Sequence, residues 1–246
     1  LIYLVHTTAR FGMFSRSVGS WIHIQPNWDI DPKYNYINYF FRRATGFFDE
    51  VCYTGTGANR TITHNLGVAP ELMIVKRRST SGTSWFTYST ATGNTNALLL
   101  DTTDAAFSAT AWNNTTPTSS VFSLGTSVGV NGSGSTYVAY LFATLAGVSK
   151  VGSYTGNGSS QTINCGFTAG ARFVLIKRTD STGDWCVFDT ARGIVSGNDP
   201  FLQVNLPNGE VTGEDAVDPD NSGFIVNETT EALNTNNATY IYLAIA

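Results

Sequence analysis

Apolar residues in this 246-residue chain fall into short runs that turn-forming residues separate. In the run at residues 71–77, four consecutive apolar side chains predict a β-strand that is central in its sheet and buried on both faces. A polar turn that contains Gly82 follows, and the aromatic-rich run at residues 85–88 comes next. These two runs therefore predict a β-hairpin.

More runs of the same kind predict strands throughout the chain. They lie at residues 51–53, 61–63, 97–100, 121–124 and 137–142. No part of the pattern predicts a helix longer than one or two turns. Roughly six to eight short strands in about 100 residues, broken by turns, are typical of a β-sandwich with jelly-roll or related topology. We therefore expect an all-β protein of jelly-roll-like sandwiches.

The chain also repeats itself when it is shifted against itself by 101 residues. Tyr53-Thr54-Gly55 then faces Tyr154-Thr155-Gly156, Lys76-Arg77 faces Lys177-Arg178 and, one residue out of step, Trp85 faces Trp185. The repetition predicts three parts: residues 1–48, the C-terminal remnant of a preceding repeat ending in a strand at 36–42; residues 49–147, repeat 1; and residues 148–246, repeat 2. Tandem β-sandwiches indicate a serial array of beads, which fits an extended structural protein better than a globular enzyme.

Composition and charge exclude several classes of protein. With 15 Phe, 11 Tyr and 5 Trp but only 13% charged residues, the chain is the opposite of a disordered sequence. A net charge of −4 argues against binding to nucleic acid, which needs clustered Lys and Arg. No apolar run approaches the roughly 20 residues of a membrane-spanning helix. We therefore expect neither nucleic-acid binding nor membrane insertion.

The sequence offers little for catalysis. A hydrolase needs a nucleophile with a base or a defined pair of carboxylates, and no nucleophile elbow or phosphate-binding loop occurs here. His64 lies in a turn between predicted strands and faces Cys165 in the other repeat. We expect a protein that is not an enzyme. His64 is a candidate for ligand contact, with a structural imidazole as the alternative.

A long polar loop at residues 101–120 holds the other candidate binding residues. Trp112 lies there beside Asn113 and Asn114. An exposed aromatic ring in this loop would stack on a sugar or anchor an interface. The alternative is that Trp112 covers the sandwich or contacts another subunit.

Positions that the two repeats share are expected to serve the scaffold. Trp85 and Trp185 begin equivalent strands, which predicts that they pack in the core. Lys76 and Lys177 lie at the ends of central strands. There we expect solvated side chains or, as the alternative, ion pairs across a subunit interface.

The second long loop, residues 205–222, carries the dense acidic run of the chain. Asp218 and Asp220 place oxygen donors at spacings that a Ca²⁺ loop could use, although the full pattern of such a loop is absent. A solvated acidic loop is the alternative. We expect no cofactor, with Ca²⁺ at Asp218 and Asp220 as the one candidate.

The repeats resemble those of bacteriophage tail-fibre proteins, especially fibres of phages that infect marine bacteria and cyanobacteria. The stretches that carry the resemblance are FFRRATGFFD at residues 40–49, HNLGVAPELMIVKRR at 64–78 and GSYTGNG at 152–158, and the resemblance covers residues 36–246. It implies an extracellular virion protein of a tail fibre or receptor-binding appendage that attaches to the host. It also implies a homotrimer that contacts other virion tail proteins and a host surface glycan or protein.

Three other functions stay open from the residues. One is a secreted carbohydrate-binding module or lectin-like domain, which would need an exposed aromatic platform. Another is a capsid decoration protein. A tailspike depolymerase is the third, but the β-helix repeats of most such enzymes are about 20 residues long, far shorter than the period of this chain.

Overall fold

A computed structural model describes residues 2–7, 10–14, 37–228 and 232–246 of the protein. Strands make up 41% of the chain and helix 2%, so the predicted all-β, sandwich-type class is confirmed. Within these ranges the one helix is the single turn α1 (Val128–Asn131).

The large sheet of repeat 1 has six antiparallel strands in the order β4-β11-β6-β7-β8-β9. In chain order they are β4 (Phe48–Thr54), β6 (Leu72–Arg77), β7 (Phe86–Ser89), β8 (Asn96–Leu99), β9 (Phe107–Ser108) and β11 (Thr136–Phe142). β6 lies inside the sheet, pairs with β7 as the predicted hairpin, and has four apolar side chains that are at most 2% exposed. The predicted central, doubly buried strand is therefore confirmed.

A small sheet covers the outer face of repeat 1. It consists of β5 (Arg60–Thr63) and β10 (Val121–Leu124). Met73 and Val75 of β6 share an apolar core with Ile62 of β5 and Phe122 of β10, which we call the outer core of repeat 1. Because side chains alternate along a strand, the other two apolar residues of β6 point to the opposite, inner face.

Repeat 2 has the same plan. Its large sheet has the order β12-β19-β14-β15-β16, with β12 (Ser149–Thr155), β14 (Phe173–Arg178), β15 (Trp185–Asp189), β16 (Leu202–Gln203) and β19 (Thr239–Ile245). Its small sheet has the order β13-β18-β17, with β13 (Gln161–Asn164), β17 (Val217–Asp220) and β18 (Gly223–Val226). Val174 and Ile176 of β14 pack with Phe224 of β18 in a second outer core.

A third sheet comes from the N-terminal part of the chain. It has the order β2-β1-β3, with β1 (Ile2–Thr7), β2 (Arg10–Phe14) and β3 (Ile37–Phe41). β3 is the strand predicted at residues 36–42. The hydrophobic pattern did not lead us to predict β1 or β2.

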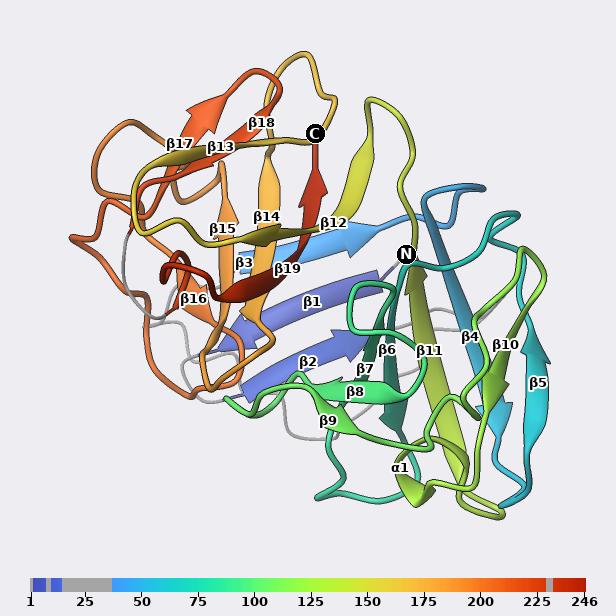
Figure 1. Cartoon of the computed structure of the whole chain (residues 1–246). Coiled ribbons are helices and arrows are strands. Elements are labelled where there is room, and N and C mark those ends of the chain that lie inside the picture. Colours follow the sequence, from blue (N-terminus) through green and yellow to red (C-terminus); the bar gives the residue numbers. More distant parts are fainter. Residues whose placement is uncertain (1, 8–9, 15–36, 229–231) are drawn as a thin grey trace.

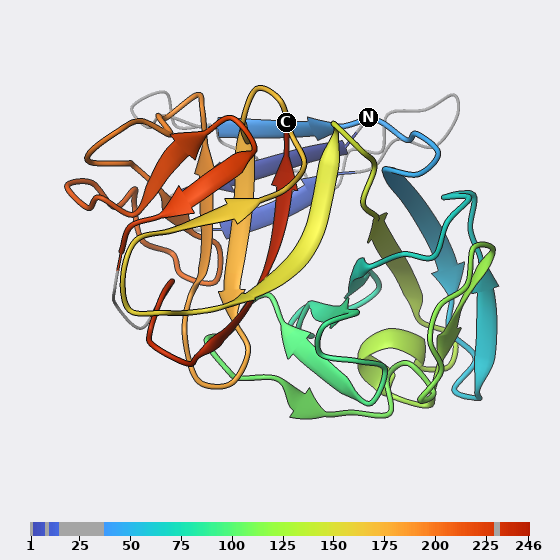
Figure 2. The ribbon, with the colours of Figure 1, turned by 45° about the horizontal axis from the view of Figure 1, so that its top comes forward.

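The inner faces of the large sheets share one apolar core, which we call the inner core. It contains Ile74 of β6, Leu175 of β14 and Phe41 of β3. Figure 1 shows repeat 2 at the upper left, repeat 1 at the lower right and the β1–β3 sheet between them, and Figure 2 shows the same three bodies after rotation. The repeats are therefore packed on each other and are not the separate beads that the sequence suggested.

The Tyr-Thr-Gly-x-Gly turn of each repeat closes around a buried asparagine. Asn234 is fully buried in repeat 2 and its amide donates to the carbonyl oxygen of Ser159 at 2.6 Å. A Cβ atom at Gly156 would lie 2.1 Å from the carbonyl oxygen of Thr235, so no larger residue fits there. Asn131 has the same role in repeat 1.

Candidate functional site

Trp112 lies in the outer core of repeat 1 and not on the surface. Its side chain is fully buried and packs edge-on against Tyr88, with 5.8 Å between ring centroids. The indole Nε1 donates to the carbonyl oxygen of Asn96 at 2.9 Å. The structure therefore contradicts the candidate role of Trp112 as an exposed ring and confirms the alternative, that Trp112 covers the sandwich. A polar loop can bury an indole when its single donor finds a backbone acceptor, as here.

Asn113 and Asn114 form the turn that follows Trp112. Their φ angles are 51° and 47°, a left-handed conformation that Asn tolerates better than most other residues. Asn114 is exposed and Asn113 is half-buried. Their role in binding stays a prediction, now without an aromatic platform beside them.

His64 is buried beneath the end of the same loop. Its Nδ1 accepts from the backbone N–H of Leu66 at 3.2 Å, and its Nε2 donates to the carbonyl oxygen of Thr118 at 3.1 Å. Burial lowers the pKa of the imidazole. Both ring nitrogens are engaged by the backbone, which is the structural role given above as the alternative.

Three carboxylates gather in repeat 2, one from the segment before β16, one from the residues just before β17 and one from β17 itself. Oxygen atoms of Asp199, Asp215 and Asp218 all lie within 4.8 Å of one another. Carboxylate oxygens are the ligands that Ca²⁺ prefers, so this group could hold such an ion. Asp220 does not belong to it, because its carboxylate accepts from the N–H and the hydroxyl of Ser222. Of the two candidates from the sequence, Asp218 thus belongs to the group and Asp220 does not, and Ca²⁺ binding stays a prediction.

Backbone amides hold the buried member of this acidic group. Asp199 is fully buried and accepts from the N–H groups of Val195, Ala216 and Val217 at 2.9, 3.2 and 3.0 Å. Burial raises the pKa of Asp199 and the charge of Asp218 raises it further, while the amide bonds oppose the shift. A buried carboxylate beside two others is a costly arrangement that the sequence pattern did not reveal.

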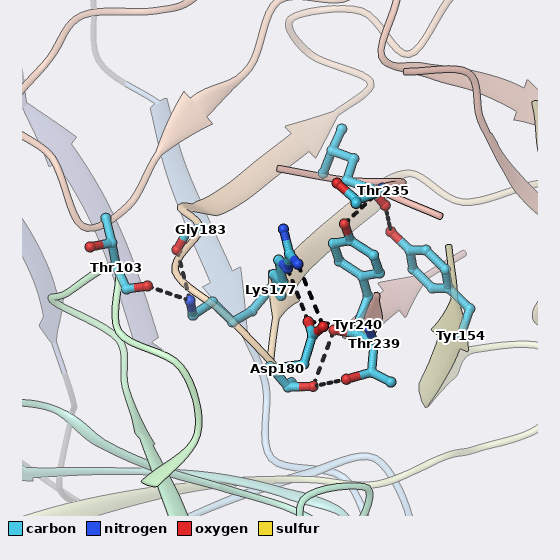
Figure 3. A network of polar contacts seen from close by, with 11 residues as sticks. Thr103, Tyr154, Lys177, Asp180, Gly183, Thr235, Thr239 and Tyr240 are labelled. Atoms are coloured by element: carbon cyan, nitrogen blue, oxygen red, sulfur yellow. Dashed lines mark hydrogen bonds and ion pairs between the residues drawn. The ribbon is translucent and has the colours of Figure 1, made fainter. Parts of the chain in front are cut away.

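A second polar cluster joins the two repeats. The ammonium group of Lys177 donates to the carbonyl oxygens of Thr103 at 3.0 Å and Gly183 at 2.7 Å (Figure 3). Trp185 donates through its indole Nε1 to the carbonyl oxygen of Leu99 at 2.9 Å. We call these five residues the inter-repeat clamp, because Leu99 and Thr103 belong to repeat 1 and the other three to repeat 2.

Lys177 was predicted to be solvated, and the structure shows that this is wrong. Its side chain is fully buried, and burial lowers its pKa to about 8. Among the residues that the structure describes, no carboxylate lies within ion-pair distance of this amine. Trp185, at 1% exposure, confirms the predicted core position.

The equivalent pair in repeat 1 is less buried. The amine of Lys76 donates to the carbonyl oxygen of Thr83 and lies 5.1 Å from the ring centroid of Trp85. Lys76 and Trp85 are both half-buried. The two lysines thus occupy the same repeat position in different surroundings. The amine of Lys177 donates to backbone of the other repeat, whereas the amine of Lys76 donates to backbone of its own repeat.

Strand β3 is tied to repeat 2 by a third cluster. The hydroxyl of Tyr39 donates to the carboxylate of Asp189 at 2.5 Å and accepts from Nη2 of Arg192 at 2.8 Å. Arg192 and Asp189 also form an ion pair whose side chains are 8% and 5% exposed. Burial raises the pKa of Tyr39, so the hydroxyl keeps its proton and serves as the donor.

Comparison with protein families adds one finding. The family model described as a domain of unknown function, DUF7483, matches residues 41–246. The chain belongs to the DUF7483 family. The match begins at the end of β3 and takes in both repeats, so the DUF7483 unit contains the inter-repeat clamp and the acidic group. No curated protein and no solved structure matches the chain.

The sequence missed several of these polar residues for a common reason. No local pattern marks these residues, because each has at least one partner in a distant segment: Lys177, Asp189, Arg192 and Asp199. The one available signal was that Lys177 follows four apolar residues of a doubly buried strand.

In the described part of the chain, no helix has the length and apolar character needed to cross a membrane.

Proposed function

We propose that the protein is a non-enzymatic structural protein of a virion, part of a tail fibre or another receptor-binding appendage that attaches to a host cell. The observation that carries the proposal is the inter-repeat clamp. Each of its side-chain donors is committed to a backbone carbonyl oxygen, so the cluster serves cohesion between repeats. A protein that must present its loops at a fixed geometry outside the cell needs such an interface.

The surface chemistry agrees with this proposal. Only 13% of the residues are charged, while Thr, Ser, Asn and Gly fill the loops. A polar surface with little charge suits an extracellular appendage, and several copies of a weak site would raise affinity through effective concentration. The resemblance to tail-fibre repeats over residues 36–246 supports the same conclusion.

The carbohydrate-binding module is the less favoured alternative. Such a module needs an aromatic ring exposed to the sugar, and Trp112, the candidate for that ring, is fully buried. The capsid decoration protein would share the virion location but not the attachment to cells.

The test is adsorption of the fluorescently labelled full chain to a panel of marine bacterial and cyanobacterial strains. We expect saturable binding to at least one strain that unlabelled chain competes away and that heat-denatured chain lacks. Binding to soluble polysaccharides in a glycan panel without adsorption to cells would favour the carbohydrate-binding module. Absence of adsorption to every strain would overturn the role in attachment.

A further inference from the structure

The N-terminal sheet has the same strand arrangement as the centre of each large sheet. The orders β2-β1-β3, β7-β6-β11 and β15-β14-β19 correspond strand for strand, and every pair is antiparallel. The last strand of each set is also the one that recurs in the sequence, in steps of about one repeat. The correspondence therefore holds in both sequence and topology.

The pairing registers agree residue by residue. The last-strand residues pair with the middle strand as Phe41 with Ile2, Phe142 with Leu72 and Ile245 with Phe173. Four residues after Ile2, His6 of β1 pairs with Phe11 of β2. Four residues after Phe173, Lys177 of β14 pairs with Trp185 of β15. His6 and Phe11 thus hold the register positions that the lysine and tryptophan of the inter-repeat clamp hold in repeat 2.

Strand β3 meets both repeats at the inner core. The ring of Phe41 lies edge-on to Phe142 of repeat 1 at 5.5 Å and to Phe173 of repeat 2 at 6.0 Å between centroids. Tyr39, two residues earlier, packs edge-on against Phe173 at 5.1 Å and bonds to Asp189. Three equivalent sheets therefore contribute to one core.

We propose that the N-terminal sheet is a third unit, equivalent to the centre of each repeat, that packs with the two repeats around one inner core. Three units of one chain contribute apolar residues to the inner core, where a homotrimer would use one unit from each of three chains. The chain is then a monomer that takes the place of a homotrimer. This inference rests on the sheets alone and holds whether or not the protein attaches to host cells.

The distribution of apolar surface supports a monomer. The inner core covers the inner faces of the repeats, and the small sheets cover their outer faces. Among residues 39–228 and 232–246, for which side-chain exposure is described, the large apolar side chains that stay exposed are far apart in sequence: Phe40, Val68, Phe107, Val128, Val148 and Val195. An obligate trimer interface needs a contiguous apolar patch instead.

The first experiment is size-exclusion chromatography of the full chain with light scattering, over a hundredfold range of concentration. We expect a mass of 26.5 kDa throughout. A mass near three times that value, or near any other multiple, that persists on dilution would overturn the proposal. Loss of host-cell binding would leave this result unchanged, so the two proposals fail separately.

The second experiment tests whether β3 packs on repeat 2 in solution. Tyr39→Phe and Arg192→Lys, alone and together, form a double-mutant cycle, and both changes are conservative enough to keep the fold. We expect the two to be coupled by about tenfold in the unfolding equilibrium constant. Tyr88→Phe, in the outer core of repeat 1, replaces Tyr39→Phe in the control cycle and should be additive with Arg192→Lys. If the effects of Tyr39→Phe and Arg192→Lys on the unfolding equilibrium constant are additive to within about twofold, the proposal that the N-terminal sheet packs as a third unit is overturned.

Discussion

The amine of Lys177 donates a hydrogen bond to the carbonyl oxygen of Thr103, 74 residues earlier in the chain and in the other repeat. The same carbonyl oxygen also accepts from the N–H of Gly183 at 2.9 Å. A loop of repeat 1 is thus held by a side chain and by the backbone of repeat 2. Because the amine is fully buried, this contact makes the joint between repeats sensitive to pH and to substitution.

The first prediction concerns the pH dependence that Lys177 gives to stability. Its pKa is about 8 in the fold and near 10.5 ordinarily, so between these values the unfolded chain binds more protons than the folded chain. The contribution of Lys177 to the free energy of unfolding must therefore increase as pH rises from about 8 to 10.5. Below that window the buried charge opposes folding by a constant amount.

The measurement is chemical denaturation of the wild type and of Lys177→Met at several pH values. The difference between them isolates Lys177 from the tyrosines and cysteines that titrate in the same range. We expect the wild type to gain stability relative to the variant across the window. Lys76→Met is the matched control and should show a smaller change, because Lys76 is half-buried. A flat difference for Lys177→Met would contradict a buried, charged amine.

The second prediction concerns the tryptophan of the inter-repeat clamp. Trp185→Phe removes the bond to the carbonyl oxygen of Leu99 and leaves a small cavity in the inner core, which should cost about 1–3 kcal/mol of unfolding free energy. Trp85→Phe, at the equivalent half-buried position, should cost less than about 1 kcal/mol. Thermal unfolding of both variants tests this, and equal losses would show that the repeat position alone decides the effect.

The strands of the repeats could be predicted because their information is local. The four apolar residues of β6 and the polar turn at Gly82 fix a doubly buried strand and its hairpin through neighbours in sequence. The shift of 101 residues then carries the same prediction to β14. β1 and β2 were not predicted, although residues 1–5 are an apolar run like those of the other strands, because the shift of 101 residues gives this region no counterpart.

The polar sites could not be predicted in the same way. Trp112 lies in a loop of Asn and Thr, and only the fold places Tyr88 and the carbonyl oxygen of Asn96 around it. Lys177 seemed a solvated strand end because the loop that buries it belongs to the other repeat. Burial of a polar side chain depends on partners that are distant in sequence, which a periodic pattern does not record.

The third prediction concerns the glycine of the Tyr-Thr-Gly-x-Gly turn. Gly156→Ala forces a methyl group to within 2.1 Å of the carbonyl oxygen of Thr235, which must move away from the turn around Asn234. We expect a loss of about 1–3 kcal/mol, the range for overpacking. Gly209→Ala is the matched control, because no atom lies within 4 Å of a Cβ there and no positive φ is involved. Urea denaturation distinguishes them, and equal stability of the two variants would refute the close-approach argument.

The last prediction concerns the coupling of two carboxylates in the acidic group. Burial raises the pKa of Asp199, three backbone N–H groups oppose that shift, and the charge of Asp218 adds a smaller upward contribution. Between the ordinary value of 3.8 and its raised value, the folded chain binds more protons than the unfolded chain, so Asp199 adds stability as pH falls through that window.

Asp218→Asn removes the neighbouring charge while its amide oxygen can still accept from the N–H of Gly197. We expect the pKa of Asp199 to fall toward its ordinary value, and the variant to lose part of the stability gained on acidification. Carboxyl carbon NMR titration of Asp199 in the wild type and the variant measures the shift directly. Asp220→Asn is the control, because the carboxylate of Asp220 bonds to Ser222 and lies outside the group. If the two variants move the titration of Asp199 equally, the three carboxylates do not form one electrostatic unit.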